Sequence, residues 1–345
     1  MDEPPGNFTP LGDHLTNTAV GISGFGGYVP ERVMTNEEWT RYVDTSDEWI
    51  VERTGIHRRR VAAEDESTAD MATAAARSAL ESRGIGPEEI DEIIVATDTP
   101  EVYTPDTASF VQRKLGAREV PSYDLGGSGC AGFVQAMDVA RSRVLTGTRR
   151  VLVIGVELIT RLVSWKIRET CVLFGDAAAG VIVERGPQMA EILGARTGTD
   201  GSQWSILTLE IGGTRKPFSL EYAQKEEHLK LIMEGRAVFR HAVHRMSEVG
   251  LDVLEAVGAK LEDVAMIVPH QANLRIVQAV AKNLSVPMEK VYTNLQEYGN
   301  TGSASVPLAL WEAHSKGRIS PGDLVLLTSF GAGFHWGAAL LRFTG

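Results

Sequence analysis

A cysteine, a histidine and an asparagine in this chain could together perform nucleophilic chemistry. Cys130 follows the glycine-rich segment 126–129 (GGSG) and precedes a helical pattern. Glycines allow a sharp turn there, and the first turn of a helix offers free N–H groups and a positive dipole end, which favour a thiolate. The position therefore predicts a nucleophile, and the alternative role of a free cysteine is that of a small buried hydrophobic side chain.

The histidine and the asparagine stand at turns that follow apolar runs. His270 ends the run 266–269 (MIVP) just before a helical pattern, where α/β folds place their ligand sites. It could be a general base, a hydrogen-bond donor or a cap. Asn300 lies in segment 298–303 (YGNTGS), where the alternative is a turn residue. Segment 330–334 (FGAGF) offers the backbone N–H groups that an oxyanion hole needs.

The chain carries one unit twice, with an offset of 173 residues. Three features keep this register: residues 128–137 (SGCAGFVQAM) with 301–310 (TGSASVPLAL), the apolar run 93–95 with 266–268, and the apolar run 151–154 with 324–327. Such self-similarity indicates duplication. It also places Asn300 on the same rim as Cys130.

Each copy alternates helical patterns with short β-branched runs. The first copy predicts helices at 67–83, 107–115 and 130–146, and strands at 93–97, 122–125 and 150–156. The second predicts helices at 236–257, 274–284 and 303–316, and strands at 265–268, near 291, at 324–328 and at 338–343. Apolar strands separated by helices predict layered α/β sheets and a cleft between two halves, residues 18–190 and 235–345. The charged, glycine-rich segment 191–234 is expected to connect the halves and cover the cleft.

The composition excludes several classes of protein. With 34 basic and 45 acidic residues among 345, the net charge of −11 argues against nucleic acid or an anionic membrane as the main partner. No stretch approaches the roughly 18 apolar residues of a membrane span. Only two cysteines are present, which suits the cytoplasm, and no Cys/His metal spacing or Walker loop occurs. Residues 1–17 lack signal-peptide features and are expected to form a loose tail.

Together these motifs resemble the β-ketoacyl-acyl-carrier-protein synthase III family. The resemblance runs from about residue 18 to 345 and rests on segments 45–56 (TSDEWIVERTGI), 128–133 (SGCAGF), 173–176 (LFGD), 269–273 (PHQAN) and 298–301 (YGNT). It implies a thiolase-like five-layered αβαβα fold made of two duplicated halves. It also implies a homodimer without a cofactor, for which the CoA thioester is a substrate.

The resemblance implies a decarboxylating Claisen condensation that initiates fatty-acid synthesis. Cys130 would take an acyl group from acyl-CoA, with the oxyanion held by the backbone N–H groups of Cys130 and Ala332. His270 and Asn300 would donate hydrogen bonds to the thioester oxygen of malonyl-acyl carrier protein as carbon dioxide leaves. The resulting carbanion would attack acyl-Cys130 and give a β-ketoacyl-acyl carrier protein.

The same motif matching implies binding roles around the cleft. For CoA it implies Thr45, Trp49, Arg53, Arg168, Gly235, Phe239, Ala272, Asn273 and Ile276, with the adenine stacked on Trp49. For the acidic carrier protein it implies a basic patch of Arg240, Arg275 and Lys282. Thr104 would end the acyl pocket where some members carry Phe, which favours an acyl chain longer than acetyl unless a neighbour such as Tyr103 fills the space.

Two segments depart from the family pattern, and other activities compete. Segment 126–129 replaces an Ala-rich segment, and 164–168 (SWKIR) replaces Asp-Trp-x-Asp-Arg, which brings Lys166 to the expected CoA mouth. Papain-like proteases share the Cys, His, Asn order, but their local signature and disulfides are missing. Thiolases need a second cysteine near the C-terminus, which 331–337 lacks, and a non-catalytic scaffold would have lost one of the three residues. A starter-unit synthase or acyltransferase of specialised metabolism on the same fold stays open.

Overall fold

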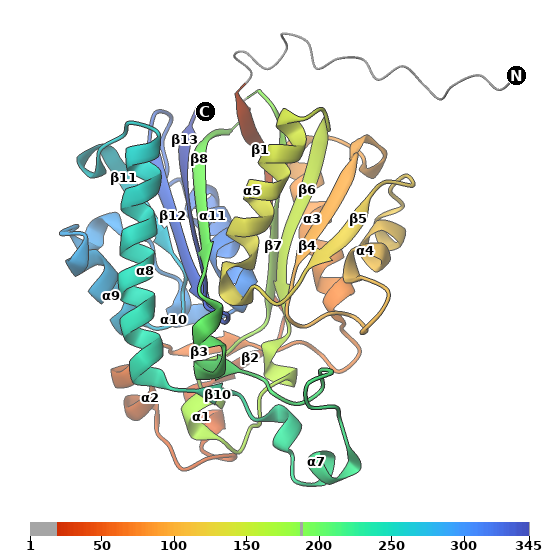
Figure 1. Ribbon diagram of the computed structural model, residues 1–345, viewed down its shortest axis with the longest axis vertical. Helices are drawn as coiled ribbons and strands as arrows, with labels where there is room; N and C mark the ends of the chain where they lie inside the picture. Colours follow the sequence, from red (N-terminus) through yellow and green to blue (C-terminus); the bar gives the residue numbers. More distant parts are fainter. Residues whose placement is uncertain (1–18, 187–188, 345) are drawn as a thin grey trace, which may run out of the picture.

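Two groups of strands with the same pairing order lie side by side in the computed structural model (Figure 1), which describes residues 19–186 and 189–344. The first group has the order β5 (Ser122–Leu125), β4 (Glu92–Ala96), β6 (Arg150–Glu157), β7 (Ala177–Arg185) and β1 (Val20–Tyr28). The second has β11 (Val264–Pro269), β12 (Leu324–Gly331), β13 (His335–Phe343) and β8 (Ala190–Thr199), with a bridge from Ile267 to Val291 beyond β11. A short pairing of β1 with β8 joins the groups into one sheet. The predicted tail, 1–17, lies outside the described residues.

The strand register repeats with the offset found in the sequence. Ile93 of β4 pairs with Leu152 of β6 in parallel, and Met266 of β11 pairs with Val325 of β12 in the same way. Both partners of the second pair lie 173 positions after those of the first. The following strands, β7 and β13, are antiparallel to β6 and β12, and β1 and β8 are antiparallel to β7 and β13. The predicted duplication is therefore present in the strand pairing itself.

Helices complete five layers around these strands. In the first half, α3 (Thr68–Arg83) contacts β1, β7 and β6, and α4 (Thr107–Leu115) packs beside it. In the second half, α8 (Gly235–Ala256) contacts β12, β13 and β8, and α9 (Leu274–Asn283) packs beside it. Between the two groups of strands, α5 (Gly132–Leu145) and α11 (Ser305–Ser315) contact strands of both halves. Three apolar clusters fill the spaces between the layers. The order is therefore αβαβα.

Local sequence signals explain where several of these helices begin and end. Ser67 and Asp70 form a reciprocal capping box at the start of α3, and Gly84 closes that helix with a left-handed conformation. The predicted helix 107–115 is confirmed at both ends, with Gly116 as its left-handed cap. The helix predicted from residue 130 differs from the structure, because Gly129–Ala131 form a 3-10 turn and α5 begins only at Gly132.

The predicted connection 191–234 begins later than expected. Residues 190–199 form β8, which pairs with β13 along its length and occupies the position of β1 in the second half. The connection proper, 200–234, carries a 3-10 segment (Gly201–Ile206), the two-stranded pair β9 (Leu207–Thr208) and β10 (Ile232–Met233), and α7 (Leu220–Gln224). In Figure 1 this connection, with β10 and α7, lies below the central sheet.

Short elements on the same side of the sheet hold the remaining motifs. They are β2 (Val33–Thr35), α1 (Asn36–Trp39), α2 (Asp47–Thr54), β3 (Arg58–Arg60), α6 (Arg168–Cys171) and α10 (Leu295–Tyr298). Cys171 ends α6, where its backbone N–H donates to the carbonyl of Ile167. The second cysteine is therefore buried among apolar neighbours, with 1% of its surface exposed.

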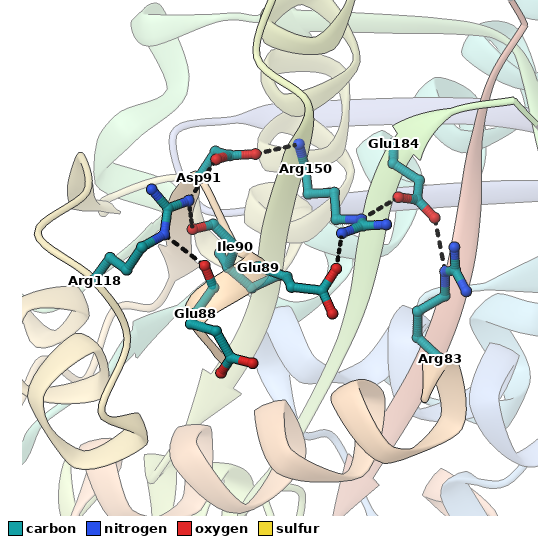
Figure 2. A network of polar contacts seen from close by, with 8 residues as sticks. All are labelled: Arg83, Glu88, Glu89, Ile90, Asp91, Arg118, Arg150 and Glu184. Carbon is teal, nitrogen blue, oxygen red and sulfur yellow. Dashed lines mark hydrogen bonds and ion pairs between the residues drawn. The ribbon is translucent and has the colours of Figure 1, made fainter. Parts of the chain in front are cut away.

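A network of charged residues fastens the opposite end of the first half (Figure 2). Arg150, at the start of β6, is buried and binds Glu184 of β7 and, at 2.5 Å, Glu89. Glu184 also binds Arg83 at the end of α3, at 2.7 Å. Because strand, strand and helix share these charges, their ends cannot separate without leaving a buried charge unpaired.

In the described parts of the chain, no helix is long and apolar enough to cross a membrane.

Candidate active site

Cys130 lies where the two halves meet, in the 3-10 turn that precedes α5. Its neighbour Gly129 has φ +53, and Gly302, 173 positions later, has φ +55 and opens the 3-10 turn before α11. The two turns are therefore equivalent, and Ser303 occupies in the second half the position that Cys130 occupies in the first. Only the first half presents a thiol, so the duplicated structure contains a single nucleophile position.

Two bare backbone segments face each other beside the thiol. A Cβ on Gly129 would lie 2.5 Å from the backbone nitrogen of Ala332, and a Cβ on Gly331 would collide with the backbone nitrogen of Cys130. Both glycines therefore let the segments 129–130 and 331–332 approach without side chains between them. The N–H groups of Cys130 and Ala332 consequently lie close together, as an oxyanion hole requires.

His270 projects from the carboxyl end of β11 and is 4% exposed. Its backbone N–H donates to the carbonyl of Thr328 on β12 at 2.8 Å, and its Nδ1 lies 2.7 Å from the hydroxyl of Ser305. Burial lowers the pKa of His270 from 6.5 to about 3. The imidazole is therefore neutral at physiological pH.

Asn300 is held by its backbone and by one side-chain atom. Its N–H donates to the carbonyl of Leu173 and its carbonyl accepts from Gly175, which ties the motif 298–301 to the motif 173–176. The side-chain oxygen accepts from the N–H of Gly302 at 3.0 Å. Because that oxygen is engaged, the amide NH2 is the group left for a ligand.

The sequence argument missed two carboxyl groups, those of Asp98 and Glu157, which line one cavity together with Cys130, His270 and Asn300. Glu157, at the end of β6, is 1% exposed and accepts hydrogen bonds from Ser303, Thr99 and the backbone of Asp98. Burial, together with the charge of Asp98, raises the pKa of Glu157, and burial also raises that of Asp98. The sequence contained a signal for Glu157, because this residue directly follows the buried run 150–156 at the carboxyl end of a strand.

These groups reverse one expectation about Cys130. The helix N-terminus was expected to favour its thiolate, but burial, and then the charges of Glu157 and Asp98, raise the pKa of the Cys130 thiol well above its usual value. Its backbone N–H acts in the opposite direction with a smaller effect. Desolvation and two acidic neighbours therefore outweigh the favourable dipole of one helical turn.

A cavity of about 750 Å³ brings most of the predicted residues together. Besides Cys130, His270, Asn300 and Ala332, its lining includes Arg53, Gly235, Phe239, Arg240, Ala272, Asn273, Arg275 and Ile276. Apolar side chains such as Ile159, Leu162 and Val163 complete the wall. The charges are divided, with arginines of α2, α8 and α9 and the carboxylates Asp98 and Glu157. The cavity can thus hold a long ligand with an anionic end.

Three residues predicted for CoA, Thr45, Trp49 and Arg168, lie outside the wall of this cavity, whereas Arg53 belongs to it. Trp49 of α2 is sandwiched between the guanidinium groups of Arg53 and Arg168, each 4.5 Å from its ring centroid. Arg168 also donates to the carbonyl of Asp44, next to the buried Thr45 hydroxyl, which has no hydrogen-bond partner among the described residues. A flat aromatic ligand that stacks on Trp49 would displace one arginine.

The structure separates two further predicted residues from the cavity. Thr104 lies in an exposed loop outside the cavity wall of its own chain, and its place at the end of the acyl pocket stays a prediction. The wall near Cys130 is instead formed by Asp98 and Thr99, which precede that loop. Lys282 is the second of these residues and is exposed at the end of α9. Asn273, in contrast, lines the cavity, and its side chain caps α9 and donates to the carbonyl of Arg53.

Segment 164–168, which departs from the family pattern, forms an ion pair and hydrogen bonds with other parts of the chain. Lys166 forms an ion pair with Glu226 of the connection, 2.6 Å apart, and the indole N–H of Trp165 donates to the carbonyl of Thr160. The backbone of Ser164 also binds the carbonyl of Leu229. The positive charge that Lys166 adds is therefore paired with an acid of the connection.

A duplicated αβαβα fold with a cysteine, a neutral histidine and an asparagine around one cavity defines a thiolase-fold condensing enzyme. Family models give the same result: 3-oxoacyl-[acyl-carrier-protein] synthase III matches residues 123–201, and its C-terminal model matches 254–343. The chain is 45% identical over 327 residues to the β-ketoacyl-[acyl-carrier-protein] synthase III of Caldanaerobacter subterraneus subsp. tengcongensis, covering 94% of this chain and 98% of the relative.

Solved structures agree with the sequence relatives. The 3-oxoacyl-[acyl-carrier-protein] synthase III of Aquifex aeolicus superimposes with a TM-score of 0.86 at 44% identity, covering 94% of this chain and all of the other. The priming β-ketosynthase of the R1128 polyketide biosynthetic pathway gives 0.85 at 35% identity, covering 94% and 96%. The chain belongs to the β-ketoacyl-[acyl-carrier-protein] synthase III family. The predicted family, fold class and enzyme class, an acyl-transferring condensing enzyme, are confirmed.

Proposed function

We propose that this chain joins an acyl-CoA primer to malonyl-acyl carrier protein and so initiates fatty-acid synthesis. The observation that carries the proposal is the arrangement of Cys130 between an N–H pair and two neutral donors in one cavity. Members of the family named above supply the reaction class, and the residues of this chain supply the roles. CoA thioester is a substrate, and no step requires a cofactor.

The first step transfers the acyl group to Cys130. The sulfur attacks the thioester carbonyl, a C–S bond forms, and the CoA thiolate leaves with the proton that the Cys130 thiol gives up. The N–H groups of Cys130 and Ala332 receive the negative charge on the carbonyl oxygen.

The second step uses His270 and Asn300. The Nε2–H of His270 and the amide of Asn300 donate to the thioester oxygen of malonyl-acyl carrier protein as its C–C bond to carbon dioxide breaks. The enolate carbon attacks the carbonyl carbon of acyl-Cys130 and forms a C–C bond, the C–S bond breaks, and the Cys130 thiolate that leaves takes up a proton from solvent. Neutral donors suit this chemistry because they stabilise the enolate oxygen without protonating the carbanion.

The mouth of the cavity would hold CoA and then the carrier protein. Trp49, with Arg53 and Arg168, would take the nucleotide near Thr45, and Gly235, Phe239, Ala272, Asn273 and Ile276 would line the pantetheine path. Arg240, Arg275 and Lys282 would meet the acidic carrier protein; Arg275 is exposed and donates to the carbonyl of Glu52. Arg275→Glu should raise the KM for malonyl-acyl carrier protein and leave acyl-CoA loading intact, and equal loss in both half-reactions would contradict that role.

We also propose a cytoplasmic homodimer. Strand β5 pairs only with β4 within the described chain, so its outer edge is free to pair with a second copy. The neighbouring loop exposes Tyr103, 84% accessible, and Val102. Two free cysteines, one of them the nucleophile, suit a reducing compartment. Sedimentation equilibrium tests the dimer.

A starter-unit synthase or acyltransferase of specialised metabolism is the second candidate. The likeness to the R1128 priming ketosynthase favours it. The two candidates differ in the primer that they load and in the fate of the loaded acyl group.

Intact-protein mass spectrometry separates these candidates. The protein is incubated with acyl-CoAs from acetyl to C12, straight and branched, and malonyl-acyl carrier protein is added afterwards. A mass gain that Cys130→Ala lacks, followed by β-ketoacyl-carrier protein and carbon dioxide, supports the synthase. Loading without condensation supports the acyltransferase, and absence of loading contradicts both.

A further inference from the structure

The catalytic histidine is in direct contact with a serine that no step above uses. Ser305 is the first residue of α11 and is 1% exposed. Its hydroxyl oxygen lies 2.7 Å from Nδ1 of His270 and 2.8 Å from the backbone nitrogen of Gln271. The hydroxyl therefore stands between a ring nitrogen and a fixed N–H donor.

The donors and acceptors around this hydroxyl can be assigned. The N–H of Gln271 can only donate, so the Ser305 oxygen accepts from it. Gln271 is itself immobile, because its side chain binds the carbonyls of Pro269 and Tyr292 and the N–H of Asn294. The hydrogen of the Ser305 hydroxyl is then available to Nδ1 of His270, which can accept it when that nitrogen is unprotonated.

A neutral imidazole carries one hydrogen, on one of its two nitrogens. His270 is neutral because burial lowers its pKa. If Nδ1 accepts from Ser305, the hydrogen resides on Nε2, the nitrogen on the far side of the ring from Ser305. His270 lines the cavity, and Nε2–H is the form that donates to a thioester oxygen. The opposite tautomer would present a lone pair to that oxygen and repel it.

We propose that Ser305 is a positioning residue that holds His270 in the Nε2–H tautomer. The inference rests on the proposed function, since a donor at Nε2 matters only if His270 stabilises the enolate. The same short segment also orients the second donor, because the N–H of Gly302 binds the side-chain oxygen of Asn300. Residues 302–305 thus set the direction of both hydrogen bonds to the substrate.

The test compares Ser305→Ala with Ser305→Thr, which keeps the hydroxyl, and with Ser247→Ala as a matched control. Ser247 is also a buried helical serine, but its hydroxyl donates only to the carbonyl of Val243 in its own helix. Two-bond 1H–15N correlation spectra of protein labelled with 15N-histidine report which ring nitrogen is protonated. The His270 signals are identified by their loss in His270→Ala.

We expect a pure Nε2–H tautomer for His270 in the unmodified protein and a mixture in Ser305→Ala. Removal of a group that fixes a histidine tautomer strongly lowers turnover in other enzymes, so decarboxylation of malonyl-acyl carrier protein should fall about tenfold or more. The KM for that substrate and the loading of Cys130 by acetyl-CoA should stay within about twofold. Ser305→Thr should restore the tautomer, and Ser247→Ala should match the unmodified protein.

Two results would overturn the inference: an Nδ1–H tautomer in the unmodified protein, or a Ser305→Ala variant that keeps both the pure Nε2–H tautomer and its decarboxylation rate. Failure of the unmodified protein to load acyl groups or to decarboxylate would contradict the proposed function instead. The spectra would then still decide whether Ser305 holds the tautomer, because they need no substrate.

Discussion

Gly129 and Ala332 lie so close together that a Cβ on the glycine would stand 2.5 Å from the backbone nitrogen of Ala332. The two residues come from different halves of the chain, yet their backbones form one wall of the site. The distance between them sets the spacing of the N–H groups of Cys130 and Ala332, which we propose bind the acyl oxygen. This contact is therefore the most direct place to test the oxyanion hole.

Gly331→Ala should abolish most acyl transfer to Cys130 and leave the fold in place. Its new Cβ would collide with the backbone nitrogen of Cys130 and push the two N–H groups apart. Loss of one oxyanion donor costs about 100-fold or more in rate, measured here as Cys130 loading by mass spectrometry. Gly213→Ala is the control, because a Cβ there meets nothing within 4 Å. Unchanged loading in Gly331→Ala would refute the N–H pair.

Asn300→Ala should separate the two half-reactions. It removes the amide donor but leaves the backbone bonds to Leu173 and Gly175 available, so acyl loading should persist. Decarboxylation of malonyl-acyl carrier protein should fall about 100-fold. Release of carbon dioxide, followed by radiolabel, measures the effect. A comparable loss of loading would show that Asn300 supports the whole site rather than the enolate.

The decarboxylation rate should not follow the ordinary titration of a histidine. Because burial lowers the pKa of His270 to about 3, the ring stays neutral from pH 7 down to pH 5. In that range the unfolded chain binds a proton at this residue and the folded chain does not, so His270 makes stability fall as pH falls below 6.5. The decarboxylation rate is measured as carbon dioxide release over a range of pH, and the pH of half-maximal rate should not lie near 6.5.

Glu157→Gln should make Cys130 more reactive. Above pH 8, where Glu157 is ionised, its charge contributes to the raised pKa of the Cys130 thiol. Glutamine removes the charge and keeps one acceptor oxygen, for either Ser303 or Thr99, which bind different oxygens of Glu157. The alkylation rate by iodoacetamide should rise about tenfold for each unit by which the thiol pKa falls. Buried Cys171 provides an internal control in the same mass spectrum. A slower or equal rate at Cys130 would contradict the assigned influence of Glu157.

Arg150→Ala should destabilise the fold without altering the site. It removes one of the two ion pairs of Glu184, 6% exposed, and leaves the pair with Arg83 (Figure 2), and breaking such a buried pair costs about 3–5 kcal/mol. Denaturant unfolding measures the loss. Lys260→Ala is the comparison, because both side chains of its pair with Glu262 are 74% exposed and such pairs contribute about 1 kcal/mol or less. Similar losses in both variants would contradict the structural role of the network.

Much of the architecture could be predicted because local patterns encode it. The offset of 173 residues between the apolar runs at Ile93 and Met266 reappears as the register of their strand pairs. The helix predicted at 67–83 is present for the same reason, since helix ends depend on a few adjacent residues such as Ser67 and Gly84. The boundary at 191 was misplaced because β8 alternates apolar with charged and glycine residues, and its pairing partner β13 lies far along the chain.

The sequence by itself determined which residue types the site contains and in what order, because Cys130, His270 and Asn300 each follow a recognisable strand or turn. Only the tertiary structure decided their chemical states. The pKa of Cys130 depends on Asp98 and Glu157, and the tautomer of His270 depends on Ser305. Desolvation and hydrogen-bond direction arise from groups that are distant in the chain and adjacent in space, and no local pattern records them.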